Sequence, residues 1–228
     1  MSAISRSLLS FRPKCPSFDL SLYLVANRPS FSDEQQFFTK ILQCVSGGVS
    51  CVQLRDHTSD TGSIIKTAMQ LKPLLYNAHV PLILNTRNLL EVSQAVYPEG
   101  LYLEEPVPIA EVRNLWGQAL SLGIPAKRMS EILAAGHKVH YVSVKVFASK
   151  KTCPRNDDIW GIQGLRTVLA NVPCPVIAIG GLTADSIEPL CQELRPQDGI
   201  AMASGLIGQP DPCATAQTIL KKMRGSHE

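Results

Sequence analysis

The sequence lacks the features of several large protein classes. No run of apolar residues approaches the roughly 18 that a membrane-spanning helix needs, and no basic run carries the interleaved aromatic residues of a nucleic-acid-binding surface. There is also no sequence repeat, low-complexity tract or domain linker. The net charge is only +3, and 45% of the residues are hydrophobic, as in a globular domain with a sizeable core. We therefore expect neither nucleic acid nor a membrane among the partners.

The cysteines form no recognisable pattern. Their number, seven, is odd, and no two of them have the CxxC spacing of a zinc or redox site. This argues for reduced thiols and predicts a cytoplasmic location. Cys44, Cys51 and Cys191 stand in apolar context, where we expect buried, unreactive thiols.

The first 19 residues carry no signal-peptide pattern, because their apolar patch is short and interrupted by arginine. We interpret residues 1–19 as an N-terminal arm, partly disordered. From residue 20 onwards, short β-branched runs alternate with amphipathic segments. Strands are predicted at 21–25, 51–54, 82–84, 100–103, 120–123, 141–146, 176–179 and 199–202. Helices are predicted at 33–45, 63–76, 87–96, 109–115, 127–135, 162–171, 184–194 and 211–222.

Eight strand–helix alternations with short links indicate a parallel sheet. They predict an α/β protein, a single-domain (β/α)8 TIM barrel over residues 20–228 with a short N-terminal arm. The alternative is an open, doubly wound sheet.

Active sites of TIM barrels lie at the C-terminal ends of the strands. In CVQLRDH, the alternation of side chains along a strand points Gln53 and Arg55 into the barrel mouth. Arg55 is then placed to clamp a phosphate or pyrophosphate; the alternative is a structural arginine paired with Asp56. The same rule sends Asn85 of VPLILNTR inward, and His57 follows the Arg55 strand end as a further candidate.

The stretch PVIAIGGLTADS predicts an anion site. Its strand ends in Gly180 and Gly181, which permit close backbone approach, and Thr183 then opens a predicted helix whose first amides attract an anion. The loops after strands 7 and 8 are a common phosphate site of this barrel. After the eighth strand, Ala203 and Ser204 offer small amide donors. We favour phosphate binding over a plain tight turn.

The lysine-rich segment FASKKTCPRNDDIWG follows the sixth strand. It is either a lid that closes over a charged substrate or a solvated surface loop. The sequence contains no catalytic-triad pattern, no HExxH motif and no Walker loop.

Taken in order, seven blocks of the sequence resemble the thiamine phosphate synthase/TenI family over roughly residues 20 to 220. They are LYLVAN, GGVSCVQLRD, VPLILNTR, HYVSVKVF, GIQGLR, PVIAIGGLT and DGIAMASGLI. The family is a TIM barrel, and its synthase members join hydroxymethylpyrimidine pyrophosphate to thiazole phosphate and release pyrophosphate with the help of Mg²⁺. The resemblance implies these small phosphorylated substrates and Mg²⁺ as cofactor, and leaves a homo-oligomer open.

The resemblance also implies roles for individual residues. Arg55, in the Q-L-R element with Gln53, faces the pyrophosphate, and Asn85 contacts the pyrimidine. Gly181 and the turn of Ala203 and Ser204 match the cradle of the thiazole phosphate, next to Gly180. Ser149 falls near a threonine of the strand-6 loop, and Lys150 or Lys151 near its lysine; with Arg55, these lysines are the implied catalytic residues.

Several positions depart from the family pattern. Thr86 stands where synthases carry a magnesium-binding aspartate, and the second such aspartate aligns with Val107. Glu104 and Glu105 are the candidate replacement ligands for Mg²⁺. His57 stands at the lysine that closes Q-L-R-x-K. Further along the chain, Pro125 takes the place of a serine, and Lys127 that of the catalytic histidine of the thiazole tautomerase branch.

Three hypotheses follow from these matches and departures. The first is a divergent thiamine phosphate synthase, which we choose as the main interpretation. The second is a phosphate-ligand binding or regulatory protein without synthase activity, suggested by the missing aspartates. The third is a tautomerase-like isomerase with Lys127 or His57 as its base.

Overall fold

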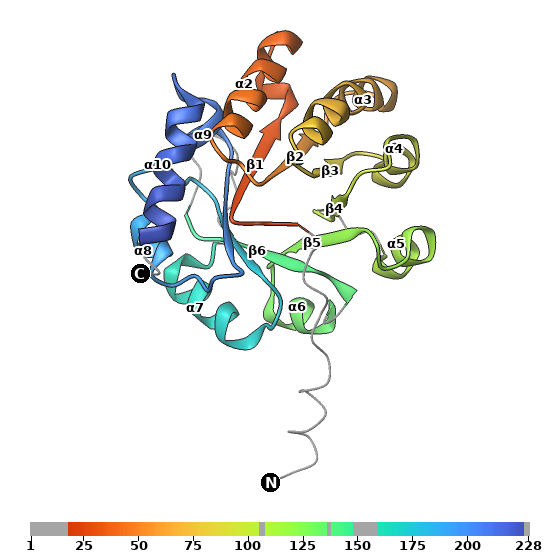
Figure 1. Cartoon of the computed structure of the whole chain (residues 1–228). Coiled ribbons are helices and arrows are strands. Elements are labelled where there is room, and N and C mark those ends of the chain that lie inside the picture. The colour runs from red at the N-terminus through yellow and green to blue at the C-terminus, as the bar shows by residue number, and fades with distance from the viewer. Residues whose placement is uncertain (1–17, 105–107, 136–137, 148–158, 226–228) are drawn as a thin grey trace.

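A closed barrel of eight parallel strands forms the centre of the computed structural model, which describes residues 18–104, 108–135, 138–147 and 159–225. Each strand pairs with the next in the chain, and β8 pairs with β1 to close the ring (Figure 1). This confirms the TIM barrel and rules out the open sheet. The strands are β1 (Leu22–Asn27), β2 (Cys51–Asp56), β3 (Leu82–Thr86), β4 (Gly100–Tyr102), β5 (Ser121–Pro125), β6 (Tyr141–Lys145), β7 (Val176–Ile179) and β8 (Gly199–Met202).

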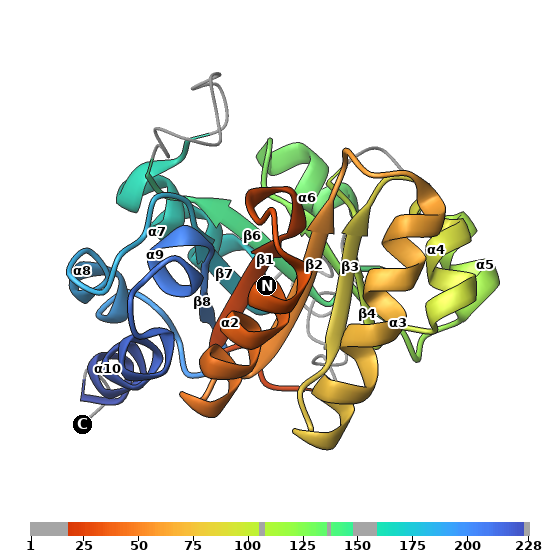
Figure 2. The same cartoon turned by 90° about the horizontal axis from the view of Figure 1, so that it is seen from above.

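Helices form an outer ring around these strands, and Figure 2 shows α2 and α3 packed outside β1, β2 and β3. The predicted N-terminal arm lies outside the described residues up to residue 17. A short 3₁₀ turn, η1 (Arg28–Ser30), follows β1. The helices are α2 (Glu34–Ser46), α3 (Thr61–Asn77), α4 (Leu89–Val96), α5 (Ile109–Trp116), α6 (Met129–Ala135), α7 (Gly161–Asn171), α8 (Glu188–Cys191), α9 (Ser204–Ile207) and α10 (Pro212–Gly225).

The helix predicted at 184–194 is wrong in extent, because only α8 within it is helical. Ser186 accounts for the late start. Its hydroxyl donates to the main-chain oxygen of Thr183 at 3.1 Å and accepts from the Thr183 N–H at 2.9 Å. Such local side-chain bonds compete with the helical ladder. The predicted helix start at Thr183 is therefore wrong, while the short α9, which the sequence did not indicate, follows β8 directly.

Side chains alternate along each strand between two apolar cores. One core lies between the sheet and the helices and takes residues such as Val52 and Leu54. The other fills the inside of the barrel and takes Tyr23, Ile83 and Tyr141. Since both faces of these strands are covered, their sequences are apolar almost throughout.

Three tyrosines form a hydrogen-bonded floor inside the barrel. The Tyr23 hydroxyl donates to Gln53 Oε1 at 2.7 Å and lies 3.1 Å from the Tyr141 hydroxyl. The Tyr102 hydroxyl lies 2.5 Å from Ser143 Oγ. We call Tyr23, Tyr102 and Tyr141 the tyrosine floor. Because a buried hydroxyl without a partner is costly, these hydrogen bonds hold the three side chains in place beneath the mouth of the barrel.

The predicted burial of Cys44, Cys51 and Cys191 is confirmed. Burial raises the pKa of the Cys44 thiol to about 12, so that this thiol is un-ionised and unreactive at neutral pH. Within the described part of the chain, no helix combines the length and the apolar character needed to cross a membrane.

We predict that Gly123→Ala destabilises the barrel by overpacking the tyrosine floor. A Cβ on Gly123 would lie 2.1 Å from Cζ of the fully buried Tyr141. The free energy of unfolding should fall by about 1–3 kcal/mol, measured by urea denaturation. Gly225→Ala, at the open end of α10, is the control and should change it by less than about 0.5 kcal/mol. A loss at Gly123 no larger than that of the control would contradict the account.

Candidate active site at the C-terminal end of the barrel

The ends of the first three strands bring three polar side chains into one layer. The strand register places Asn27 beside Arg55, and Arg55 beside Asn85. One layer deeper, Gln53 lies beside Val25 and Ile83 and is 4% exposed. Because side chains two positions apart share a face, Gln53, Arg55 and Asn85 all face the inside of the barrel, as the alternation rule predicted.

Arg55 forms its main contact with Glu104, which follows β4. Its Nε donates to Glu104 Oε2 and its Nη2 to Glu104 Oε1, both at 3.2 Å, in a two-pronged ion pair. Nη1 donates to Asn27 Oδ1 at 3.3 Å. The alternative pairing of Arg55 with Asp56 is wrong: the Asp56 carboxylate accepts from the loop after β2, including the N–H groups of Thr58 and Ser59, at 3.0 Å each.

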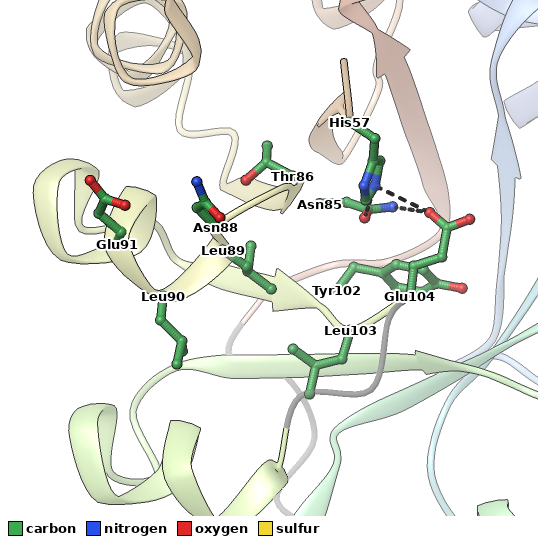
Figure 3. Close-up of a pocket in the computed structure, with 10 residues that line it drawn as sticks. All are labelled: His57, Asn85, Thr86, Asn88, Leu89, Leu90, Glu91, Tyr102, Leu103 and Glu104. Carbon is green, nitrogen blue, oxygen red and sulfur yellow. Dashed lines mark hydrogen bonds and ion pairs between the residues drawn. The ribbon is translucent and has the colours of Figure 1, made fainter. Parts of the chain in front are cut away.

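His57 and Asn85 complete the ring of donors around the Glu104 carboxylate. His57 Nε2 lies 2.8 Å from Asn85 Oδ1 and 3.5 Å from Glu104 Oε2, and Asn85 Nδ2 donates to the same Oε2 at 2.9 Å. Figure 3 shows these three side chains turned toward one another. Lys127 Nζ donates to the main-chain oxygen of Glu104 at 3.3 Å, so the segment after β4 is held from two sides. We call Arg55, His57, Asn85 and Glu104 the mouth cluster.

The electrostatics of the mouth cluster follow from these contacts. Burial raises the pKa of the Glu104 carboxyl, but the hydrogen bonds from His57 and Arg55 and the charge of Arg55 outweigh it and lower that pKa far below its usual range. The hydrogen bond to Glu104 raises the pKa of His57 above its ordinary value, against the effect of burial. Glu104 is therefore an anion at neutral pH, and it favours the protonated form of His57.

A cavity of about 370 Å³ opens beside the mouth cluster, between β3, β4 and the start of α4. His57, Asn85 and Glu104 line it on one side, and Glu91 on the other (Figure 3). Thr86 also lines it and is 5% exposed, and among the described residues its Oγ1 has no hydrogen-bond partner. A buried hydroxyl without a partner is unusual in a native protein, so this wall of the cavity offers an unused polar contact.

The opposite side of the mouth is formed by the loops after β7 and β8. Gly180 and Gly181 have φ of +105° and +57°, a left-handed backbone that favours glycine. A Cβ on Gly205 would lie 2.0 Å from the Leu182 main-chain oxygen, so the two loops are in close contact. Ala203 and Ser204 lie where β8 passes into α9. The structure thus brings together the residues of the predicted phosphate cradle, and phosphate binding there stays a prediction.

Lys145 is a mouth residue that the sequence reasoning missed. It ends β6 on the same face as Tyr141 and Ser143, and a Cβ on Gly180 would lie 2.9 Å from its Cγ. The alternation rule that identified Arg55 would have identified Lys145 as well, because each is the last inward-facing residue of its strand.

Other predicted site residues fall outside the described residues: Glu105, Ser149, Lys150 and Lys151, together with the aligned position Val107. As they are arranged, the oxygen ligands that the described residues offer do not fit a magnesium ion. Glu104 is taken up by Arg55, His57 and Asn85, and Thr86 supplies a neutral hydroxyl in place of a carboxylate. No group of three or more histidine, cysteine, aspartate or glutamate side chains suited to a metal ion occurs in the described ranges.

We predict that His57 titrates above its ordinary pKa of 6.5 and that Glu104→Gln lowers this pKa, because the neutral amide no longer favours the imidazolium. The stability that this contact contributes is therefore full below pH 6.5 and is lost as the pH rises through the folded-state pKa. Titration of the histidine ring protons by NMR measures both values. His140, whose pKa burial and Arg113 lower to about 4, is the internal control that should not move. A His57 pKa that stays in place after the substitution would count against the contact.

Comparison with known proteins agrees with this architecture. The family model described as "Thiamine monophosphate synthase" matches residues 22–206. A thiamine-phosphate synthase of Methanobrevibacter smithii is 28% identical over 215 residues, covering 92% of this chain and 99% of that protein. A thiamine-phosphate synthase 2 of Streptococcus pneumoniae is 33% identical over 207 residues, covering 90% and 95%.

Among solved structures, a thiamine phosphate pyrophosphorylase from Pyrococcus furiosus superposes with a TM-score of 0.78 at 23% identity, covering 92% of this chain and 98% of that one. At that identity the superposition speaks for the shared barrel alone. The family match spans most of the chain and includes the strands that carry the mouth cluster. The chain therefore belongs to the thiamine monophosphate synthase family.

Proposed function

We propose that the protein is a thiamine phosphate synthase, which joins hydroxymethylpyrimidine pyrophosphate to thiazole phosphate and releases pyrophosphate, in thiamine biosynthesis. Membership of the family and the full-length relatives named thiamine-phosphate synthase support the activity. The observation in the chain itself that carries it is the layer of Asn27, Arg55 and Asn85 at the mouth of the barrel. This layer supports the proposal because it presents a guanidinium at the strand ends, where the resemblance implies pyrophosphate binding.

Each part of the mouth has a role in this proposal. Arg55 binds the pyrophosphate group through two parallel N–H donors, and His57, which Glu104 favours in its charged form, adds a second cation. Gln53 and Asn85 contact the pyrimidine. The backbone at Gly180, Gly181, Ala203 and Ser204 holds the thiazole phosphate. Ser149, Lys150 and Lys151, which lie outside the described residues, act on the substrates from the stretch of sequence after β6.

The chemistry needs positive charge at the leaving group. As the C–O bond to the pyrophosphate breaks, negative charge grows on the departing oxygen and positive charge on the methylene carbon beside the pyrimidine ring, to which the thiazole nitrogen then bonds. Cations already held in place stabilise this charge separation without reorganising. Asn27 accepts from Arg55, and Asn85 contacts His57, before any substrate arrives. Because the oxygen ligands among the described residues do not fit Mg²⁺, this mechanism contains no step at a metal.

A second candidate function is a phosphate-ligand binding protein of the same family without synthase activity. The observation that favours it is the pairing of Arg55 with an internal carboxylate, together with Thr86 at the position of a family aspartate. The tautomerase-like alternative uses Lys127 or His57 as its base. In the structure, Lys127 is hydrogen-bonded to the main-chain oxygen of Glu104 and His57 to the side chain of Asn85, so no contact among the described residues favours either as a base.

We predict that Arg55→Ala lowers kcat/KM for thiamine phosphate formation by at least about 100-fold, since removing one donor aimed at developing negative charge typically costs that much. The assay supplies both substrates, with and without added Mg²⁺, and detects thiamine phosphate. Arg224→Ala, exposed at the end of α10, loses the same charge far from the mouth and should keep wild-type activity. If concentrated wild-type protein forms no thiamine phosphate under either condition, the synthase proposal fails.

A further inference from the structure

We propose that Glu104 is an internal competitor for the pyrophosphate site: its carboxylate occupies the two parallel donors of Arg55 and forms an ion pair with His57, and the pyrophosphate group must displace it to bind. This inference rests on the proposed function, because it takes Arg55 as the residue that receives pyrophosphate. It assigns Glu104 a part in setting affinity for the anionic group, in place of the metal-ligand role suggested by the sequence.

The two parallel N–H donors of Arg55, on Nε and Nη2, are already used. A guanidinium binds an oxyanion best through two parallel N–H groups. Here Nε and Nη2 both donate to Glu104, and Nη1 donates one hydrogen bond to Asn27. Asn85 Nδ2, another donor at the mouth, also points at Glu104 Oε2. A pyrophosphate oxygen reaching this position meets a carboxylate in the place that it would occupy.

The Glu104 carboxylate can be displaced by a ligand. The side chains of Arg55 and Glu104 are 35% and 38% exposed, so both are in reach of a ligand from solvent. An ion pair with this much exposure is weaker than a fully buried one, because water screens it. The carboxylate brings one negative charge to Arg55 and His57, whereas pyrophosphate brings several and more acceptor oxygens. The ligand therefore has the stronger attraction, but must first break the contacts of Glu104.

Only the side chain of Glu104 has to move for this displacement. Lys127 Nζ binds the Glu104 main-chain oxygen, and β4 ends at Tyr102, whose hydroxyl lies against Ser143 in the buried floor. The backbone that carries Glu104 thus stays anchored while its carboxylate rotates away. The same anchoring returns the carboxylate to Arg55 when pyrophosphate leaves, so the exchange also favours release of the product.

The opposite role would be support, in which Glu104 only holds Arg55 in the orientation that pyrophosphate needs. The two roles predict effects of opposite sign when the charge of Glu104 is removed. A competitor weakens pyrophosphate binding, so removing it tightens binding. A support strengthens binding, so removing it loosens binding.

The test is isothermal titration calorimetry of inorganic pyrophosphate into the full chain, in metal-free buffer containing a chelator. We expect Glu104→Gln to bind pyrophosphate on the order of tenfold more tightly than wild type, the scale of a displaced charged hydrogen-bonded contact. Glu91→Gln is the matched control. It removes the same charge from the far side of the same cavity, away from His57 and Glu104, and should change the affinity less than twofold (Figure 3).

Thermal unfolding of each variant first establishes that it is folded, and Glu104→Ala, which removes the carboxylate without an amide, must change affinity in the same direction. Equal or weaker binding by Glu104→Gln overturns the inference. If wild type still binds pyrophosphate and Arg55→Ala abolishes that binding, the assigned role of Arg55 survives this failure. If neither wild type nor Glu104→Gln binds pyrophosphate at millimolar concentration, both the inference and that role are overturned.

Discussion

The ion pair between Arg55 and Glu104 is the interaction around which the mouth of this barrel is organised. It joins the end of β2 to the segment after β4 across the intervening β3, whose Asn85 binds the same carboxylate. His57 and Lys127 add contacts from two further loops. Without the negative charge of Glu104, Arg55 and His57 would face each other at the mouth as like charges, which is unfavourable in a partly buried site.

The same ion pair distinguishes this chain from the pattern that its family blocks suggest. Where that pattern places aspartates for magnesium, this protein has the hydroxyl of Thr86 and, at the mouth, a carboxylate already saturated by donors. In the proposed function, such a site meets the charge of a pyrophosphate group with its own cations, and Glu104 balances those cations when no substrate is present. The proposed synthase and the alternative phosphate-binding protein differ in one respect: in the synthase, the bond to pyrophosphate breaks after the substrate has displaced Glu104 from Arg55.

Sequence patterns predicted the parts of the structure that local rules control. The strands at 176–179 and 199–202 were predicted at their observed bounds, and the inward direction of Arg55 and Asn85 followed from alternation alone. The partner of Arg55 could not be predicted in this way, because Glu104 is 49 residues away and meets it only when the barrel closes. The helix predicted after β7 begins later than expected because Ser186 forms local hydrogen bonds with Thr183. The spacing of apolar residues gives no information about such bonds.

The central claim is that a pyrophosphate group and Glu104 compete for Arg55, and a crystal structure of the protein with inorganic pyrophosphate bound tests it most directly. The account predicts pyrophosphate oxygens at Nε and Nη2 of Arg55, with the Glu104 carboxylate rotated away from the guanidinium and its backbone in place. Pyrophosphate bound elsewhere, with the Arg55–Glu104 ion pair intact, would contradict it.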